Sequence, residues 1–187
     1  MRNALSGVVA DESVWDDPNS DESQALDWLA AVDPMGLDVA MTPPEILHER
    51  FVVVLLYFAT NGDNWARSDL NFLSGSSVCS WHSSDEARGV ACDRDAVESI
   101  RLYNTNLEGT LPEELGILSS LTLLNFASNS LVGSIPVSFE NLTRLEAMDV
   151  SDNEFVGQLG EGLFRLPRLE RVYFGGNQIA GELPSSI

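Results

Sequence analysis

LTLLNFASNSLVGSIPVSFENLTR, residues 121–144, is the stretch that decides the fold, because the chain repeats its pattern on both sides without a gap. The units have 24 positions and cover residues 97–120, 121–144, 145–168 and 169–187, the last one incomplete. Self-similarity at a fixed period of roughly 20 to 50 residues is the mark of a repeat architecture, in which each unit packs on its neighbours. We therefore expect stacked coils over residues 97–187.

When the units are aligned, equivalent positions form columns, and physical reasons explain why the same residue types recur in a column. The fourth and sixth positions are apolar in every unit, as in Ile100 and Leu102, and alternate with variable residues, which predicts a short strand with one face inward. An asparagine at the ninth position offers donors and an acceptor to backbone groups that a turning coil leaves unpaired. A glycine at the thirteenth suits an unusual backbone dihedral or a close approach between coils. These two columns hold Thr105, Asn129, Asn153 and Asn177, and Gly109, Gly133, Gly157 and Gly181.

The segment LTLLNFASNSLVGSIP resembles the plant-type leucine-rich repeat, L-x-x-L-x-L-x-x-N-x-L-x-G-x-I-P, of cell-surface receptors, receptor-like proteins and secreted inhibitors. The resemblance implies an α/β repeat fold: a right-handed superhelical solenoid with a parallel sheet on its concave side. Proline follows at the sixteenth position in Pro112, Pro136 and Pro184, whereas the third unit has Gly160 there. The last unit stops at Ile187 with no polar covering, so we expect the chain to be part of a longer array.

The residues before the repeats divide into two parts. Residues 1–22 are acidic and poor in periodic apolar positions, so we expect a disordered tail. Residues 23–96 are expected to form a helical N-terminal cap. In it, Ser23 caps one helix over residues 24–32, and the capping box that begins at Thr42 opens a second helix, which ends at Asn61-Gly62. Its apolar run is far shorter than the roughly 20 residues that span a bilayer.

Cys79 and Cys92 are the only cysteines. The order Cys79-Ser80-Trp81 … Gly89-Val90-Ala91-Cys92 resembles the cysteine block of the cap that precedes plant-type repeats, and the helix followed by NGDNW at residues 61–65 is similar to the cap of algal surface proteins. The resemblance implies a disulfide bond, although the inserted residues 82–88 make the spacing longer than usual. A crosslink of this span contributes about 3 kcal/mol to stability. The alternative is two free thiols in a cytosolic protein.

Composition excludes several functions. The net charge is −19 and the chain has no lysine, which argues against binding nucleic acid or an anionic membrane surface and excludes a Walker-type phosphate loop. The two histidines, His48 and His82, have no partners at ligand spacing, and both are expected to be exposed. Residues 149–154 match a calcium loop only in part, without its glycine and distal glutamate. We therefore expect no metal, no cofactor and no enzymatic activity.

The variable residues beside the inward strand positions line the inner surface of a solenoid, which repeat proteins use to bind partners. Aromatic residues and arginine are favoured at binding hot spots, and two aspartates give the surface an acidic middle. The alternative for each of these residues is an ordinary solvated side chain. The predicted ligand-binding residues are Arg101, Tyr103, Asn125, Asp149, Asp152, Arg171 and Tyr173.

These observations favour a non-enzymatic recognition module that binds a protein, peptide or glycan, as in receptor-like proteins outside the cell or at its surface. The alternatives are the ectodomain of a leucine-rich-repeat receptor kinase, a secreted hydrolase inhibitor, and an intracellular scaffold. Membrane attachment would use segments outside this chain. One glycosylation sequon, Asn141-Leu142-Thr143, is expected on the outer side of the second unit.

Overall fold

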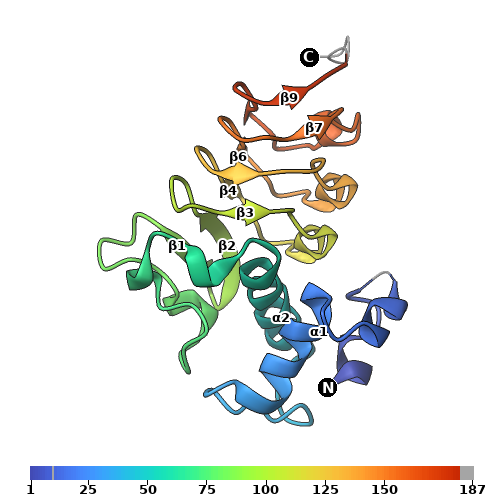
Figure 1. Ribbon diagram of the computed structural model, residues 1–187, viewed down its shortest axis with the longest axis vertical. Helices are drawn as coiled ribbons and strands as arrows, with labels where there is room; N and C mark the ends of the chain where they lie inside the picture. The colour runs from blue at the N-terminus through green and yellow to red at the C-terminus, as the bar shows by residue number, and fades with distance from the viewer. Residues whose placement is uncertain (10, 182–187) are drawn as a thin grey trace.

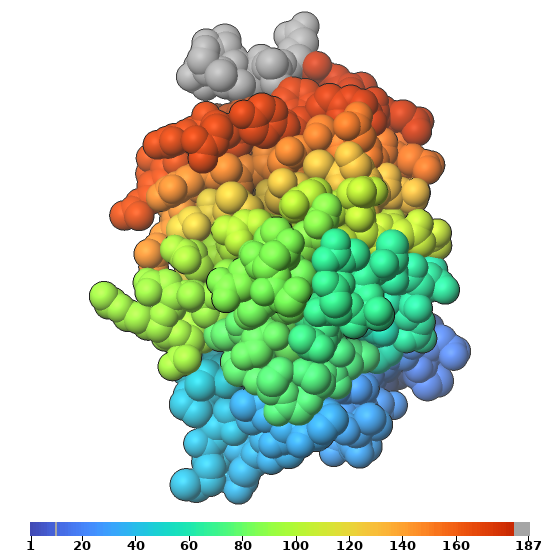
Figure 2. Space-filling model, turned by 90° about the vertical axis from the view of Figure 1, so that its left-hand side faces the viewer, coloured from blue at the N-terminus to red at the C-terminus, as the bar shows by residue number. Residues whose placement is uncertain are grey.

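The structure is a computed structural model that describes residues 1–9 and 11–181. Its repeats stack as four successive coils above a helical N-terminal region (Figure 1). Figure 2 shows the coils as bands of colour up the molecule, with the blue N-terminal residues below them. The predicted Pro184 and the end of the last unit at Ile187 lie outside the described residues.

The coils are joined by one sheet with the order β1-β2-β4-β6-β8. Its strands are β1 (Gly89–Asp93), β2 (Ala96–Arg101), β4 (Leu123–Asn125), β6 (Ala147–Asp149) and β8 (Arg171–Tyr173). The last four strands run parallel, and Ile100 pairs with Leu124, Leu124 with Met148, and Met148 with Val172. Equivalent positions of the repeat therefore lie side by side, as the sequence predicts for a parallel sheet. Strand β1 is antiparallel to β2 and forms one edge.

Each coil has a second short strand, and in the first three coils a 3-10 helix follows it. The strands pair as β3 (Glu108–Gly109) with β5 (Ser130–Leu131) and β7 (Val156–Gly157) with β9 (Gln178–Ile179). The 3-10 helices are η7 (Glu113–Ile117), η8 (Val137–Asn141) and η9 (Leu163–Arg165), on the side opposite the main sheet (Figure 1). The column glycines have φ values of 105° at Gly109, 79° at Gly133, 84° at Gly157 and 113° at Gly181. These values lie in the left-handed region, so the backbone conformation explains why glycine recurs at this position.

The inward columns form the core. Leu102, Phe126 and Val150 are fully buried, and Phe174 of the last described coil is half-buried. Between coils, the asparagine amides satisfy backbone groups as the sequence predicts. Asn153 accepts from the Leu131 backbone amide at 3.0 Å and donates to the carbonyls of Phe126 and Val150 at 2.9 and 3.2 Å. Asn129 and Asn177 repeat this pattern. Neighbouring coils are therefore joined by both packing and side-chain hydrogen bonds.

The helical N-terminal region, residues 1–9 and 11–96, is built around α2 (Pro44–Ala59). Helix α2 is buried on most of its surface, which fits its run of apolar residues from Phe51 to Leu56. Around it lie η1 (Arg2–Leu5), η2 (Glu12–Asp16), α1 (Asp21–Asp27), η3 (Trp28–Val32), η4 (Gly62–Asn64), η5 (Ser68–Leu70) and η6 (Val78–Ser80).

Residues 1–22, which we expected to be a disordered tail, are instead folded where the structure describes them, and their apolar side chains join the core around α2. Leu5, Val8, Val9 and Trp15 are buried, and Trp15 lies 5.9 Å from the ring of Phe51. The acidic residues between them stay on the outside. The few apolar positions, although not periodic, supply enough contact to hold the segment on the helix.

Local details of the predicted helices also differ. Helix α1 begins at Asp21 and is capped by Ser20, whose side chain accepts from the Ser23 amide at 3.1 Å. The predicted capping box at Thr42 is wrong, since α2 begins after Pro43 without a side-chain cap. His48 and His82 are half-buried rather than exposed, and Nε2 of His48 lies 2.8 Å from the carbonyl oxygen of Ala4.

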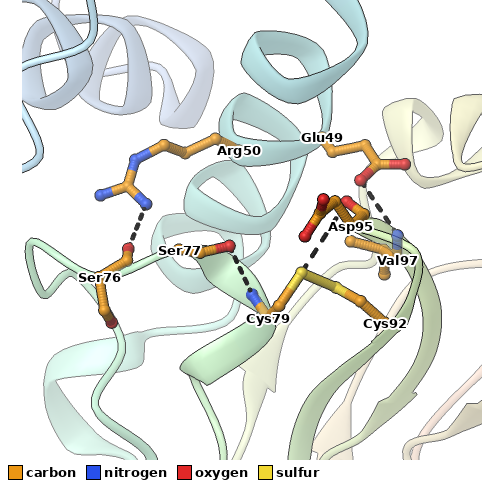
Figure 3. The surroundings of a disulfide bond; sticks show 8 residues. All are labelled: Glu49, Arg50, Ser76, Ser77, Cys79, Cys92, Asp95 and Val97. Carbon is orange, nitrogen blue, oxygen red and sulfur yellow. Dashed lines mark hydrogen bonds between the residues drawn. A yellow bond between two sulfur atoms is a disulfide. The ribbon is translucent and has the colours of Figure 1, made fainter.

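The helical region joins the repeats around the disulfide (Figure 3). Cys79 and Cys92 are bonded, as the resemblance implied, and link η6 to β1. Adjacent residues of α2 hold the two sides of this bridge: the Glu49 carboxylate accepts from the Val97 amide at 3.0 Å, and Arg50 donates to the Ser76 carbonyl at 2.8 Å. Burial raises the pKa of Glu49, and the hydrogen bond from Val97 partly offsets this.

Arg50 is the most buried charge of this region, with 1% of its side chain exposed. Its guanidinium makes a two-pronged ion pair with Asp33, at 2.6 and 2.7 Å, and lies 4.8 Å from the ring centroid of Trp81. It also donates to the carbonyls of Ser74 and Ser76. The charge is therefore compensated on every side, which a buried arginine requires.

Candidate ligand-binding face

The outward side chains of the main sheet form a central row on the side of the sheet away from the core, which we call the concave face. Neighbouring strands pair Arg101 with Asn125, Asn125 with Asp149, and Asp149 with Tyr173. Tyr173 is 53% exposed, and the other three are half-buried. The row thus combines a cation, an amide, an anion and an aromatic ring on a rigid scaffold. Arg171 stands beside it on β8, exposed, with its nearest ion-pair partner Glu170 at 3.7 Å.

Two members of the row also have a local structural role. The Asn125 side-chain oxygen accepts from the Ala127 amide at 3.1 Å, and Asp149 accepts from the amide and hydroxyl of Ser151 at 3.0 and 2.6 Å. These bonds close the turn that follows each strand. They hold the side chains in one position and leave the outer lone pairs available.

The backbone conformation explains why an aspartate stands at position 152. It shares the eighth column of the repeat with Asn104, Ser128 and Gly176, and all four have a positive φ, from 51° to 69°. Asparagine, aspartate and glycine tolerate this conformation best. Sequence reasoning placed Asp152 among the ligand-binding residues without this turn requirement, which the column of small polar residues already indicates.

Tyr103 is half-buried because a neighbouring arginine covers it. The guanidinium carbon of Arg88 lies 3.9 Å from the centre of the Tyr103 ring, and Arg88 Nε donates to the Tyr103 carbonyl at 3.0 Å. Arg88 belongs to the inserted loop of residues 82–88, for which the repeat gives no register. Sequence reasoning therefore missed it.

A hollow of about 230 Å³ lies beside β1 at the edge of the concave face. Its walls include His82, Glu86, Arg88 and Arg101, and the disulfide forms part of its lining. Gly89 is required there, since a side chain would meet the Trp81 carbonyl oxygen at 2.2 Å. This close contact brings the inserted loop against the sheet, and with it two arginines from different elements.

The remaining predicted site residue, Asn141, lies apart from the concave face. It is exposed at the end of η8, and Thr143 of the sequon is exposed as well. Within residues 1–9 and 11–181, no cluster of three or more potential metal ligands occurs. In the same residues, no helix combines the length and apolarity needed to cross a bilayer.

Comparisons with known proteins agree with this architecture. The family model described as "Leucine Rich Repeat" matches residues 120–142. The matched stretch, which is nearly all of the second unit, is a leucine-rich repeat. Among curated proteins, none matches the sequence.

Two solved structures share the fold of the chain. The structure of PEPR1-AtPEP1 is 30% identical with a TM-score of 0.56, and covers 66% of this chain and 18% of that one. The Arabidopsis receptor kinase HAESA, solved with the peptide hormone IDA and the co-receptor SERK1, is 26% identical with a TM-score of 0.58. The match covers 78% of this chain and 23% of the HAESA chain. The chain thus spans about a fifth of the length of these proteins.

Proposed function

We propose that this chain is a non-enzymatic recognition module that binds a peptide or protein on its concave face, outside the cell, as part of a receptor-like protein. The observation that carries the proposal is the central row, Arg101, Asn125, Asp149 and Tyr173. Inward columns keep one chemical character in every coil, whereas this row changes from strand to strand on the same register. Chemical variety on a regular scaffold suits recognition of one specific partner.

Two further observations support the proposal. HAESA, which shares the fold, is a receptor kinase solved with a peptide hormone. The Cys79–Cys92 disulfide supports a location outside the cell, because such bonds persist in oxidising compartments and are rare in the cytosol. An intracellular scaffold with reduced cysteines is correspondingly disfavoured. We also propose that the repeats are of the plant type, with the helical region as their N-terminal cap, similar to algal surface proteins.

Peptide selection tests the binding face. We would select peptides from a displayed random library on the immobilised wild-type chain. They should bind the Tyr173→Ala variant at least about tenfold more weakly than the wild type, as expected of a hot-spot aromatic. Asp149→Asn is a matched test of charge, because Asn125 shows that asparagine makes the same turn bond. Val137→Ala, at an exposed position of η8, is the control on the other side. Binders that tolerate both concave substitutions and lose affinity for Val137→Ala would overturn the proposal.

The sequon gives an independent test of export. We propose that Asn141 carries a glycan, because it is exposed and lies away from the central row. Secretion from a eukaryotic host should give a mass that falls on treatment with an N-glycosidase, and Asn141→Gln should remove this difference. An unmodified Asn141 in secreted protein would contradict the assignment of this site.

A further inference from the structure

We propose that the hollow beside β1 is a subsite for a carboxylate of the bound peptide, which deepens and rests on the proposed recognition function. The chain carries a net charge of −19, so an anionic ligand group is repelled over most of the molecule. The hollow is different, because Arg88 and Arg101 both line it, with His82 and Glu86 as its other ionisable walls. It adjoins the central row through Arg101.

Arg88 is held in place before any ligand arrives. Its guanidinium stacks on the Tyr103 ring at 3.9 Å, and its Nε is occupied by the Tyr103 carbonyl at 3.0 Å. The two terminal nitrogens make no ion pair within the part of the chain that the structure describes. A stacked guanidinium loses little side-chain freedom on binding, which favours affinity for a small planar anion.

Arg101 reaches the hollow from the sheet. It is the cross-strand partner of Gly89 in β1, and among the described residues its guanidinium makes no ion pair. The nearby acids have partners of their own: Asp69 pairs with Arg67 at 2.7 Å, and Asp85 accepts from Ser83. Asp69 also feels the charge of Arg88, but among the described residues neither acid forms an ion pair with the two hollow arginines.

A carboxylate fits this pair best. Guanidinium groups present parallel N–H donors that match the two oxygens of a carboxylate, and such charge-assisted hydrogen bonds are about twice as strong as neutral ones. Glu86 is the one fixed negative charge in the lining and opposes the ligand. Its exposed position in the inserted loop lets it be replaced without loss of packing.

The site can be probed without knowing the natural ligand. We would titrate the full ¹⁵N-labelled chain with three probes. The first is acetyl-tetraalanine with a free terminal carboxylate, the second is the same peptide with a terminal amide, and the third is an amidated peptide that contains one aspartate. The readout is the shift of the Arg88 and Arg101 Nε–H signals and of the Ala91 amide. Both carboxylate probes are expected to bind in the millimolar range if the site accepts either source, and only the first if it selects a chain end.

Matched variants decide the assignment. Arg101→Gln should weaken the carboxylate probe at least about tenfold, and Glu86→Gln should strengthen it about threefold, whereas Arg144→Gln, at an exposed position of the second unit, should leave it unchanged. Unchanged backbone signals elsewhere confirm that the variants fold. Equal shifts with the acid and amide probes, or equal binding by Arg101→Gln, would overturn the subsite.

The outcomes separate the two proposals. If library peptides need Tyr173 and Asp149 but neither a carboxylate nor Arg101, the carboxylate subsite is wrong and recognition on the concave face stands. If the carboxylate probe binds the hollow but no selected peptide depends on the central row, the hollow is a carboxylate site, but the proposed recognition function fails and with it the role of the hollow in peptide binding.

Discussion

The repeats and the helical N-terminal region solve the same problem, burial of an apolar core, in different ways. In the repeats each interaction recurs: Asn129, Asn153 and Asn177 make equivalent hydrogen bonds in successive coils. In the helical region the central interactions occur once, as in the Arg50–Asp33 pair beneath Trp81. A repeated contact can be lost in one coil and retained in the next, whereas a unique one has no substitute. The following variants test this difference, from the largest expected effect to the smallest.

Removing one partner of the buried ion pair should have the largest effect. Asp33→Asn leaves the buried Arg50 charge without its counter-ion and is expected to lower the free energy of unfolding by about 3–5 kcal/mol. Urea denaturation measures it. The double variant Asp33→Leu with Arg50→Met should recover much of the loss, since no unpaired charge remains. If the two variants are equally unstable, the cost comes from lost packing and not from the charge.

The disulfide comes next. Cys79→Ser with Cys92→Ser opens a loop with a sequence separation of 13 residues, and we expect a loss of about 3 kcal/mol. Hydrogen exchange should show the loss mainly in η6 and β1. The control is the wild-type chain in reductant, which should match the double variant. Equal loss of protection in the last coils would show that the two regions unfold as one unit.

A single member of the asparagine ladder should have a smaller effect. Asn153→Ala leaves the Leu131 amide without its acceptor, at an expected cost of about 2 kcal/mol. The carbonyls of Phe126 and Val150 lose one donor each but still accept from Asn129 and Asn177. Asn177→Ala should cost less, because Asn177 is less buried and water can replace its bonds. Urea denaturation of both variants tests the ranking. A larger loss for Asn177→Ala would contradict it.

Two glutamates with raised pKa values, one in each region, should give the smallest effect and a pH-dependent one. Burial raises the pKa of Glu49, in α2, and of Glu114, in the first coil, above the ordinary glutamate value. The folded state therefore binds these protons more tightly than the unfolded chain, so each contribution favours folding at low pH and is lost as the pH rises through the folded-state pKa. Glu49→Gln and Glu114→Gln should each raise stability at neutral pH by about 1 kcal/mol or less.

The check is the difference in unfolding free energy between each variant and the wild type at several pH values. It should vanish below the ordinary glutamate pKa, where the wild-type carboxyl is also neutral. A difference that stays constant with pH would show that the amide acts through a new hydrogen bond instead.

Sequence reasoning was most informative where interactions recur. The period gave the strand register from Ile100 to Val172, the buried columns and the role of the asparagines, because every unit reports the same local geometry. The cysteine pair came from the resemblance and not from spacing alone. The central row also followed from the register, although its binding role stays a prediction.

The rest depended on contacts between distant residues. Nothing in the order of residues 1–22 shows that Trp15 meets Phe51, because their contact is made once. Arg88 comes from an insertion without register, so neither its stacking on Tyr103 nor the hollow could be predicted. Asp152 was assigned to ligand binding although its column already carried a turn signal, seen in the positive φ values.

Because Glu49 and Arg50 are neighbours in α2, the rotation of this helix about its axis decides whether both side chains reach their partners. One side chain secures the start of the first coil and the next secures the loop before the disulfide (Figure 3). One extra residue in the helix turns everything beyond it by about 100°. An insertion between Arg50 and Ala59 would thus rotate these two anchors away from coil one, whose Gly109 and Thr110 meet the helix end at Ala59. The length of this segment is therefore as strictly fixed as the period of the repeats.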